Sequence, residues 1–203
     1  MYLVGLTGGI ASGKSSVATR WVQHGAVEID ADVLAREAVS AGSAGLARVA
    51  QEFGENLIQT DGQLDRAALA AIVFNDPAKR EKLESIIHPI VRELALKRIQ
   101  ALPESTIAIY TVPLLVEANV SLPFDKVVTV EAPEREQIKR MVANRGMSEA
   151  DALARIKSQA TPAQRANRAD VILNSNQTLP ELVADADVLW AQIVREASEK
   201  QND

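Results

Sequence analysis

The sequence predicts an α/β fold of the P-loop NTPase type, in which a mostly parallel sheet is flanked by helices. Two observations lead to this prediction. Short apolar segments alternate with longer segments of helical periodicity along the 203 residues. The stretch LTGGIASGKSS, residues 6–16, contains a glycine, four further residues and then Gly13-Lys14-Ser15. This pattern is typical of a phosphate-binding loop when it follows a strand and opens a helix, as it does here.

The first elements predicted are a strand, the loop, a helix and a second strand. Residues 2–6 form a short apolar run that leads into the loop. Apolar residues then recur at helical spacing as far as Gly25, which ends the helix. Residues 26–29 predict the second strand, with Asp30 and Asp32 at its carboxyl end. These segments together make up a βαβ unit.

The middle of the chain is predicted to be helical, and we expect a small inserted lobe at about residues 40–105. Asp76 and Pro77 resemble a helix N-cap followed by proline at the first helical position. Pro89, directly after His88, lacks a backbone donor and is expected to kink or interrupt its helix.

The remaining elements return to alternation. Three more strands are predicted, at 106–112, 126–130 and 171–173. Helices are predicted to begin at Glu134, at a capping box of Ser148 and Asp151, and at Leu179, the last extending to Ala197. We expect one domain over residues 1–203, with a helical lid at about 138–168.

Ligands of such sheets bind outside the carboxyl ends of the strands. Three segments are predicted to meet there: the phosphate loop, the Asp30–Asp32 segment and residues 113–117 after the third strand. The glycines of the loop allow backbone N–H groups to point at phosphate oxygens. Lys14 would reach the β- and γ-phosphates, and the Ser15 hydroxyl would hold Mg²⁺.

Asp32 fits the carboxylate that orients an acceptor hydroxyl and accepts its proton in a kinase. The spacing also allows Asp30 or Asp32 to cap a following helix. His88 fits a substrate-facing position or an ordinary structural histidine. The arginines between 139 and 168, Arg140 among them, fit a mobile basic lid and equally a solvated helical face.

Composition excludes several other classes. The net charge of −5 and pI near 5.2 argue against nucleic-acid binding. No apolar run reaches the roughly 20 residues of a membrane span, and no secretory signal is visible. The chain has no cysteine and 2 histidines, so disulfides, Cys-based zinc sites and histidine metal clusters are not expected. We expect a cytoplasmic protein with no obligate protein partner.

Taken in order, the motifs resemble those of dephospho-coenzyme A kinases over nearly the whole chain. They are TGGIASGKSS, IDAD, the HP pair at 88–89, VPLLVE at 112–117, MSEADALARIKSQ and RAD at 168–170. The resemblance implies ATP-dependent phosphorylation of the 3′-hydroxyl of dephospho-coenzyme A, the last step of coenzyme A synthesis.

The resemblance also implies roles for individual residues. Asp32 would be the catalytic base, and Lys14 would act with it. ATP would be bound by Gly9, Ile10, Ala11, Ser12, Gly13, Lys14, Ser15, Ser16 and Arg140. Dephospho-coenzyme A would be bound by Asp32, His88, Pro113, Leu114 and Leu115, and the helical lobe would hold it.

Two alternatives remain open from the residues alone. The first is another P-loop kinase of small molecules, acting on a nucleoside, nucleotide or sugar. The second is a nucleotide-dependent switch or hydrolase that serves protein partners. The chain contains no Asn-Lys-x-Asp base-reading motif, and its third strand ends in Val112-Pro113 rather than in a metal-binding acid. Both features argue against the second alternative.

Overall fold

A five-stranded sheet forms the centre of the fold in the computed structural model, which describes residues 1–74 and 76–202. The strand order is β2-β3-β1-β4-β5. The strands are β1 (Tyr2–Gly8), β2 (Val27–Asp30), β3 (Ile107–Thr111), β4 (Lys126–Glu131) and β5 (Val171–Asn174). β1 pairs in parallel with β3 and β4, and β4 pairs in parallel with β5. The predicted α/β class and all five predicted strands are confirmed.

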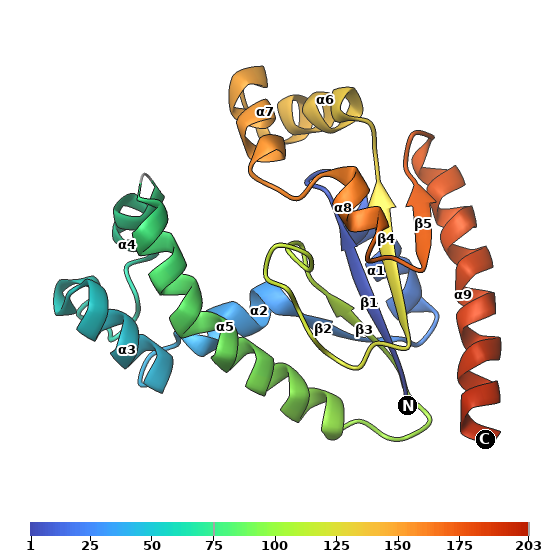
Figure 1. The fold of residues 1–203 in the computed structure, drawn as a ribbon, viewed down its shortest axis with the longest axis horizontal. Helices are drawn as coiled ribbons and strands as arrows, with labels where there is room; N and C mark the ends of the chain where they lie inside the picture. Colours follow the sequence, from blue (N-terminus) through green and yellow to red (C-terminus); the bar gives the residue numbers. More distant parts are fainter. Residues whose placement is uncertain (75, 203) are drawn as a thin grey trace. The chain divides into compact units, whose positions relative to one another are not determined.

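Helices connect the strands, as Figure 1 shows. They are α1 (Lys14–Gln23), α2 (Ala31–Ala38), α3 (Ala44–Phe53), α4 (Arg66–Phe74), α5 (Pro77–Gln100), α6 (Glu134–Arg145), α7 (Glu149–Lys157), α8 (Pro162–Ala166) and α9 (Leu179–Asn202), with a short 3₁₀ turn η1 (Glu55–Leu57). None of the helices in the described residues is long and apolar enough to cross a membrane.

The chain divides into two compact units. The first comprises Met1–Ile29 and Leu102–Asp203, and the second comprises Asp30–Ala101. The first unit therefore contains the phosphate loop and almost all of the sheet. The second contains α2 to α5.

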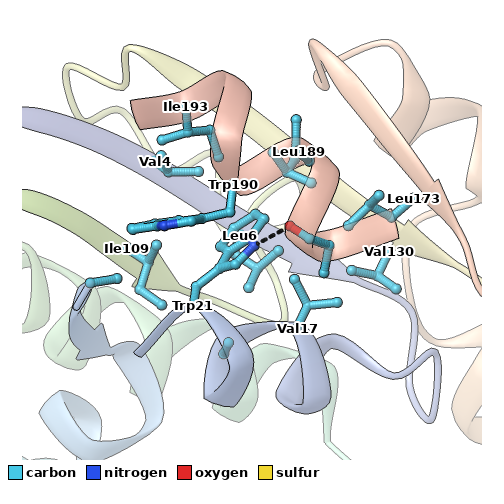
Figure 2. Close-up of a cluster of buried hydrophobic side chains, with 14 of the residues drawn as sticks. Val4, Leu6, Val17, Trp21, Ile109, Val130, Leu173, Leu189, Trp190 and Ile193 are labelled. Carbon is cyan, nitrogen blue, oxygen red and sulfur yellow. Dashed lines mark hydrogen bonds between the residues drawn. The ribbon is translucent and has the colours of Figure 1, made fainter. Parts of the chain in front are cut away.

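Helices α1 and α9 cover one face of the sheet in the first unit, and their packing anchors α1. Figure 2 shows Trp21 of α1 between the strands and α9. Its side chain is fully buried, and its indole N–H donates to the Ala186 carbonyl at 2.9 Å. The Trp21 and Trp190 ring centroids lie 6.1 Å apart. Apolar burial of this kind is the main stabilising term of such a fold. It anchors α1, whose first turn follows the phosphate loop.

A polar cluster joins the amino-terminal ends of β1 and β4 to α9. The Tyr2 hydroxyl donates to the Glu196 carboxylate at 2.5 Å, and the Lys126 ammonium donates to it at 2.7 Å. Burial raises the pKa of the Glu196 carboxyl, but hydrogen bonds from Lys126, Tyr2 and Gln192 outweigh it and hold the pKa at about 2. Burial and the same hydrogen bond raise the pKa of the Tyr2 hydroxyl.

The second unit has its own apolar core. Buried residues from α3, η1 and the adjoining segments pack together, namely Val39, Leu46, Val49, Leu57, Leu64 and Leu69. Asp76 caps α5 by accepting from the Lys79 N–H at 3.1 Å, and Pro77 is the first helical residue, as predicted. Pro89 was expected to kink or interrupt its helix; the interruption does not occur, because α5 continues through Pro89 to Gln100, and the kink stays a prediction. Pro89 is exposed, so water can satisfy the carbonyl that proline leaves without a donor.

Candidate phosphate-binding site

The loop between β1 and α1 has the backbone shape of a phosphate cradle. Gly13 has a φ of +101° directly before α1, and Gly8 has a φ of +153° at the end of β1. A Cβ on Gly8 would lie 2.4 Å from the Val130 carbonyl oxygen, so no other residue fits there. Ala11 has a φ of +56°, which is unusual for a residue with a side chain.

Helix α1 directs its amino terminus toward this loop. The Ser16 and Val17 N–H groups donate to the Gly13 carbonyl at 3.0 and 3.3 Å, which closes the first turn. The first amides of a helix have no intrahelical acceptor, and the helix dipole adds partial positive charge there. Lys14 is half-buried and Ser15 is exposed in this turn. Together these groups form an anion site suited to phosphate.

Side chains from distant segments hold the tip of the loop. The Ile10 N–H donates to Gln159 Oε1 at 2.8 Å. Gln137 Nε2 donates to the Ile10 carbonyl at 2.6 Å. Arg140 Nη1 donates to the Ala11 carbonyl at 3.1 Å. The backbone of the loop is therefore held by two residues of α6, Gln137 and Arg140, and by Gln159 in the connection between α7 and α8.

Arg140 is also bound to the segment after β5. Its guanidinium donates to the Ser175 hydroxyl at 2.9 Å and to the Ser175 carbonyl at 2.7 Å. The guanidinium thus bridges the phosphate loop and this segment. A direct contact with ATP stays a prediction for this residue.

A buried ion pair lies behind the loop. Arg165 of α8 is 4% exposed and donates from Nε and Nη2 to the two Glu131 carboxylate oxygens, both at 2.6 Å. A Cβ on Gly9 would lie 3.1 Å from Arg165 Nη2 and 2.5 Å from Gln137 Nε2. The second glycine of the loop therefore makes room for these two side chains.

The loop after β3 contains three of the predicted acceptor residues. Leu114 is 41% exposed, whereas Leu115 is fully buried. The Pro113 carbonyl accepts from the Thr7 hydroxyl at 3.5 Å, and the Glu117 carboxylate accepts from the Ala160 N–H at 2.6 Å. Only Leu114 of the two leucines offers its side chain to a ligand in this arrangement.

The other predicted residues, Asp32 and His88, belong to the second unit. Asp30, not Asp32, caps α2: its carboxylate accepts from the Asp32 N–H at 2.7 Å and from the Val33 N–H at 3.3 Å. Asp32 lies in the first turn of α2 with an exposed side chain. His88 is exposed on α5. Its neighbour Pro89 lines a cavity of about 390 Å³, together with Gly45, Ile90 and Leu94 among others.

Two further observations concern ligands at the loop. A cavity of about 370 Å³ adjoins the loop on α1, lined by Ser15, Ser16, Thr19, Arg20, Gln23, Leu179 and Val183. Within residues 1–74 and 76–202, no three histidine, aspartate or glutamate side chains gather into a metal site.

The predicted lid at about 138–168 includes Gln159 and Arg165, but the sequence did not reveal the bonds of Gln137 and Gln159 to Ile10 or the pairing of Arg165 with Glu131. Each of these side chains lies more than a hundred residues from the loop in sequence, and no local motif links it to the loop. The stretch MSEADALARIKSQ contains Gln159 but gives no indication of its partner. Only the packing of α6 to α8 against the sheet brings these residues to Ile10 and Gly9.

A glycine-rich loop between a strand and a helix, at the carboxyl edge of a parallel sheet, defines a P-loop nucleotide-binding protein. Comparison with known proteins narrows this class. Residues 2–181 match the family model of dephospho-CoA kinase. The chain belongs to the dephospho-CoA kinase family, and it is an ATP-dependent kinase.

Curated relatives support this assignment. A dephospho-CoA kinase of Thermobifida fusca is 46% identical over 96% of this chain and 98% of the relative. One of Streptomyces avermitilis is 43% identical over 97% and 96% of the two chains.

Solved structures agree with it. A protein of Thermus thermophilus matches with a TM-score of 0.79 and 31% identity, over 94% of this chain and 97% of that one. The dephospho-CoA kinase of Campylobacter jejuni matches with a TM-score of 0.67 and 25% identity, over 94% and 96%.

Proposed function

We propose that this kinase transfers the γ-phosphoryl group of ATP to the 3′-hydroxyl of dephospho-CoA, with the phosphate loop and Asp32 in the principal roles. The observation that carries the proposal is the loop in its strand–helix setting, within a chain that matches the dephospho-CoA kinase family over residues 2–181. The acceptor is then a small molecule, and the product is coenzyme A.

The loop, residues 9–16, would bind the ATP phosphates through Lys14 and through part of its backbone amides. The Ile10, Ser12 and Ser16 amides are not among them, because they donate to Gln159 Oε1 and to the Gly9 and Gly13 carbonyls. The positive end of α1 and the Lys14 ammonium favour the charge that develops on the transferred group. Gly8 and Gly13 have positive φ values that residues with a Cβ rarely adopt, so glycine at these two positions permits the backbone shape of the loop. Arg140 supports this loop through the Ala11 carbonyl.

Mg²⁺ would neutralise phosphate charge when bound with ATP. The residues present fit such an ion, since Ser15 is exposed in the first turn of α1 and offers a hydroxyl oxygen. Magnesium usually keeps several waters and binds through one or two protein oxygens plus substrate phosphates. The scarcity of clustered acidic ligands among the described residues agrees with that mode.

Asp32 would orient the acceptor hydroxyl and accept its proton. As the acceptor oxygen bonds to the γ-phosphorus, the bond from that phosphorus to the bridging oxygen breaks and ADP leaves. Asp30 caps α2 and leaves the Asp32 carboxylate exposed, which supports this division of roles. His88, Pro113 and Leu114 are proposed to contact the acceptor, and buried Leu115 to hold its loop in place.

Product analysis tests this proposal. The kinase is incubated with Mg·ATP and either dephospho-CoA or its 3′-deoxy analogue, and the products are examined by mass spectrometry and ³¹P NMR. We expect one phosphoryl group at the 3′ position of dephospho-CoA and none on the analogue. Phosphorylation of the 3′-deoxy analogue would contradict the proposal.

We propose the cytoplasm as the place of action, and the absence of cysteine is compatible with it.

A further inference from the structure

We propose that Gln159 and Gln137 are positioning residues that clamp Ile10 and thereby set the phosphate loop for ATP. The inference rests on the proposed function, in which this loop binds the ATP phosphates. Neither glutamine needs to touch the reacting atoms. Each would act through the backbone of the loop.

The direction of both hydrogen bonds is fixed by the backbone. The Ile10 N–H can only donate, so Gln159 must present its carboxamide oxygen, at 2.8 Å. The Ile10 carbonyl can only accept, so Gln137 must present its NH₂ group, at 2.6 Å. One residue of the loop is therefore held at both polar groups, by side chains with opposite roles.

The neighbouring residue shows why such a clamp is needed. Ala11 has a φ of +56°, a left-handed conformation that is unfavourable for a residue with a Cβ. A strained backbone persists when its surroundings determine it. Gln137 and Gln159 hold Ile10, the residue before Ala11, and Arg140 donates to the Ala11 carbonyl. These three contacts hold the tip of the loop in the shape that the first turn of α1 continues.

Gln159 is itself held in place. It lies in the connection between α7 and α8, where the next residue, Ala160, is bound on both sides. The Ala160 N–H donates to Glu117, and its carbonyl accepts from Arg165 Nη1 at 2.5 Å. Gln137 is 4% exposed. Two rigidly placed glutamines can position a loop more precisely than mobile surface side chains could.

The donor and acceptor roles make different variants informative. Gln159→Glu keeps an oxygen acceptor for the Ile10 N–H, whereas Gln159→Ala removes it. Gln137→Glu loses the donor and places a carboxylate against the Ile10 carbonyl. Gln192→Ala is the matched control, because Gln192 is exposed on α9 and bonded to Glu196, away from the loop.

The first readout is amide hydrogen exchange of Ile10 by NMR, measured without nucleotide. We expect exchange of the Ile10 N–H to rise at least tenfold in Gln159→Ala and to stay within threefold of wild type in Gln159→Glu and Gln192→Ala. Unchanged exchange in Gln159→Ala would overturn the clamp.

The second readout separates positioning from a general loss of stability. In Gln159→Ala we expect KM for ATP to rise about tenfold, the order of magnitude of one hydrogen bond, with KM for dephospho-CoA within twofold of wild type. Partial unfolding would lower kcat and leave both KM values unchanged, and that result would overturn the inference. The dissociation constant of a non-hydrolysable ATP analogue is measured in parallel, without acceptor. If wild type binds the analogue but does not phosphorylate dephospho-CoA, the proposed function fails while the clamp is still tested by this constant.

Discussion

Asp30 and Asp32 show how two identical residues, two positions apart, acquire different roles. Asp30 accepts two backbone N–H groups at the start of α2, and Asp32 is exposed in the first turn of the helix. From spacing alone, either residue could have been the cap. The structure assigns the cap to Asp30 because the chain turns from β2 into α2 at that residue. The catalytic role of Asp32 stays a prediction.

Replacement of Asp32 tests that role. Asp32→Asn keeps the shape of the side chain but removes the proton acceptor, so we expect kcat to fall by roughly 10²–10⁴. The dissociation constant for ATP should stay near that of wild type, since the loop is intact. Steady-state kinetics and nucleotide titration measure the two quantities. Near wild-type turnover would refute the assignment of the base.

Replacement of Asp30 should affect stability instead. Asp30→Ala removes the acceptor for two amides at the start of α2, and the loss of such a cap costs about 1 kcal/mol. We expect this decrease in the free energy of unfolding in urea. Asp30→Asn is the control, because asparagine also caps helices well. An equal loss of stability in Asp30→Asn would show that the cap is not the cause.

At the scale of elements, α8 is joined to the sheet by a charged pair rather than by apolar packing alone. The Arg165 side chain is 5% and the Glu131 side chain 15% exposed, and their contact is bidentate. Removing one partner of a buried pair leaves an uncompensated charge. We expect Arg165→Met to lower the free energy of unfolding by about 3 kcal/mol.

The double variant Arg165→Met, Glu131→Gln should recover part of that loss, because it removes the remaining charge. Urea denaturation of wild type, Arg165→Met, Glu131→Gln and the double variant gives the coupling energy between the two positions. Simple additivity of the two single variants would contradict a direct coupling between these side chains.

The same scale shows what sequence reasoning could and could not predict. The strands and most helix starts follow from apolar periodicity and caps, which are local, and Ser148 caps α7 as expected. The alternative that Pro89 interrupts its helix was wrong, because at an exposed position water can satisfy the carbonyl that the proline leaves without a donor. The contacts of Ile10 with Gln137 and Gln159 could not be predicted from the sequence. Each contact joins segments more than a hundred residues apart, and such contacts produce no periodic pattern in the sequence.

For the whole molecule, α9 is joined to the sheet by groups that titrate in acid. Folding lowers the pKa of Glu196 from its ordinary 4.5 to about 2. A lowered carboxyl pKa contributes stability that is complete above about pH 4.5 and is lost as the pH falls toward 2. We expect the free energy of unfolding of wild type to fall more steeply below pH 4.5 than that of Glu196→Gln. Parallel curves for the two proteins in urea titrations from pH 6 to 3 would contradict this role.

The acceptor of the phosphoryl group distinguishes a dephospho-CoA kinase from the alternatives, and the rate of ADP release with different acceptors identifies it most directly. The rate of ADP release from Mg·ATP is measured with dephospho-CoA, adenosine, AMP, pantetheine or water as the separate acceptors. We predict turnover with dephospho-CoA and only background release with the others. Equal release with water alone would indicate a hydrolase or switch and contradict the account, and faster release with AMP or adenosine would indicate a kinase with a different acceptor.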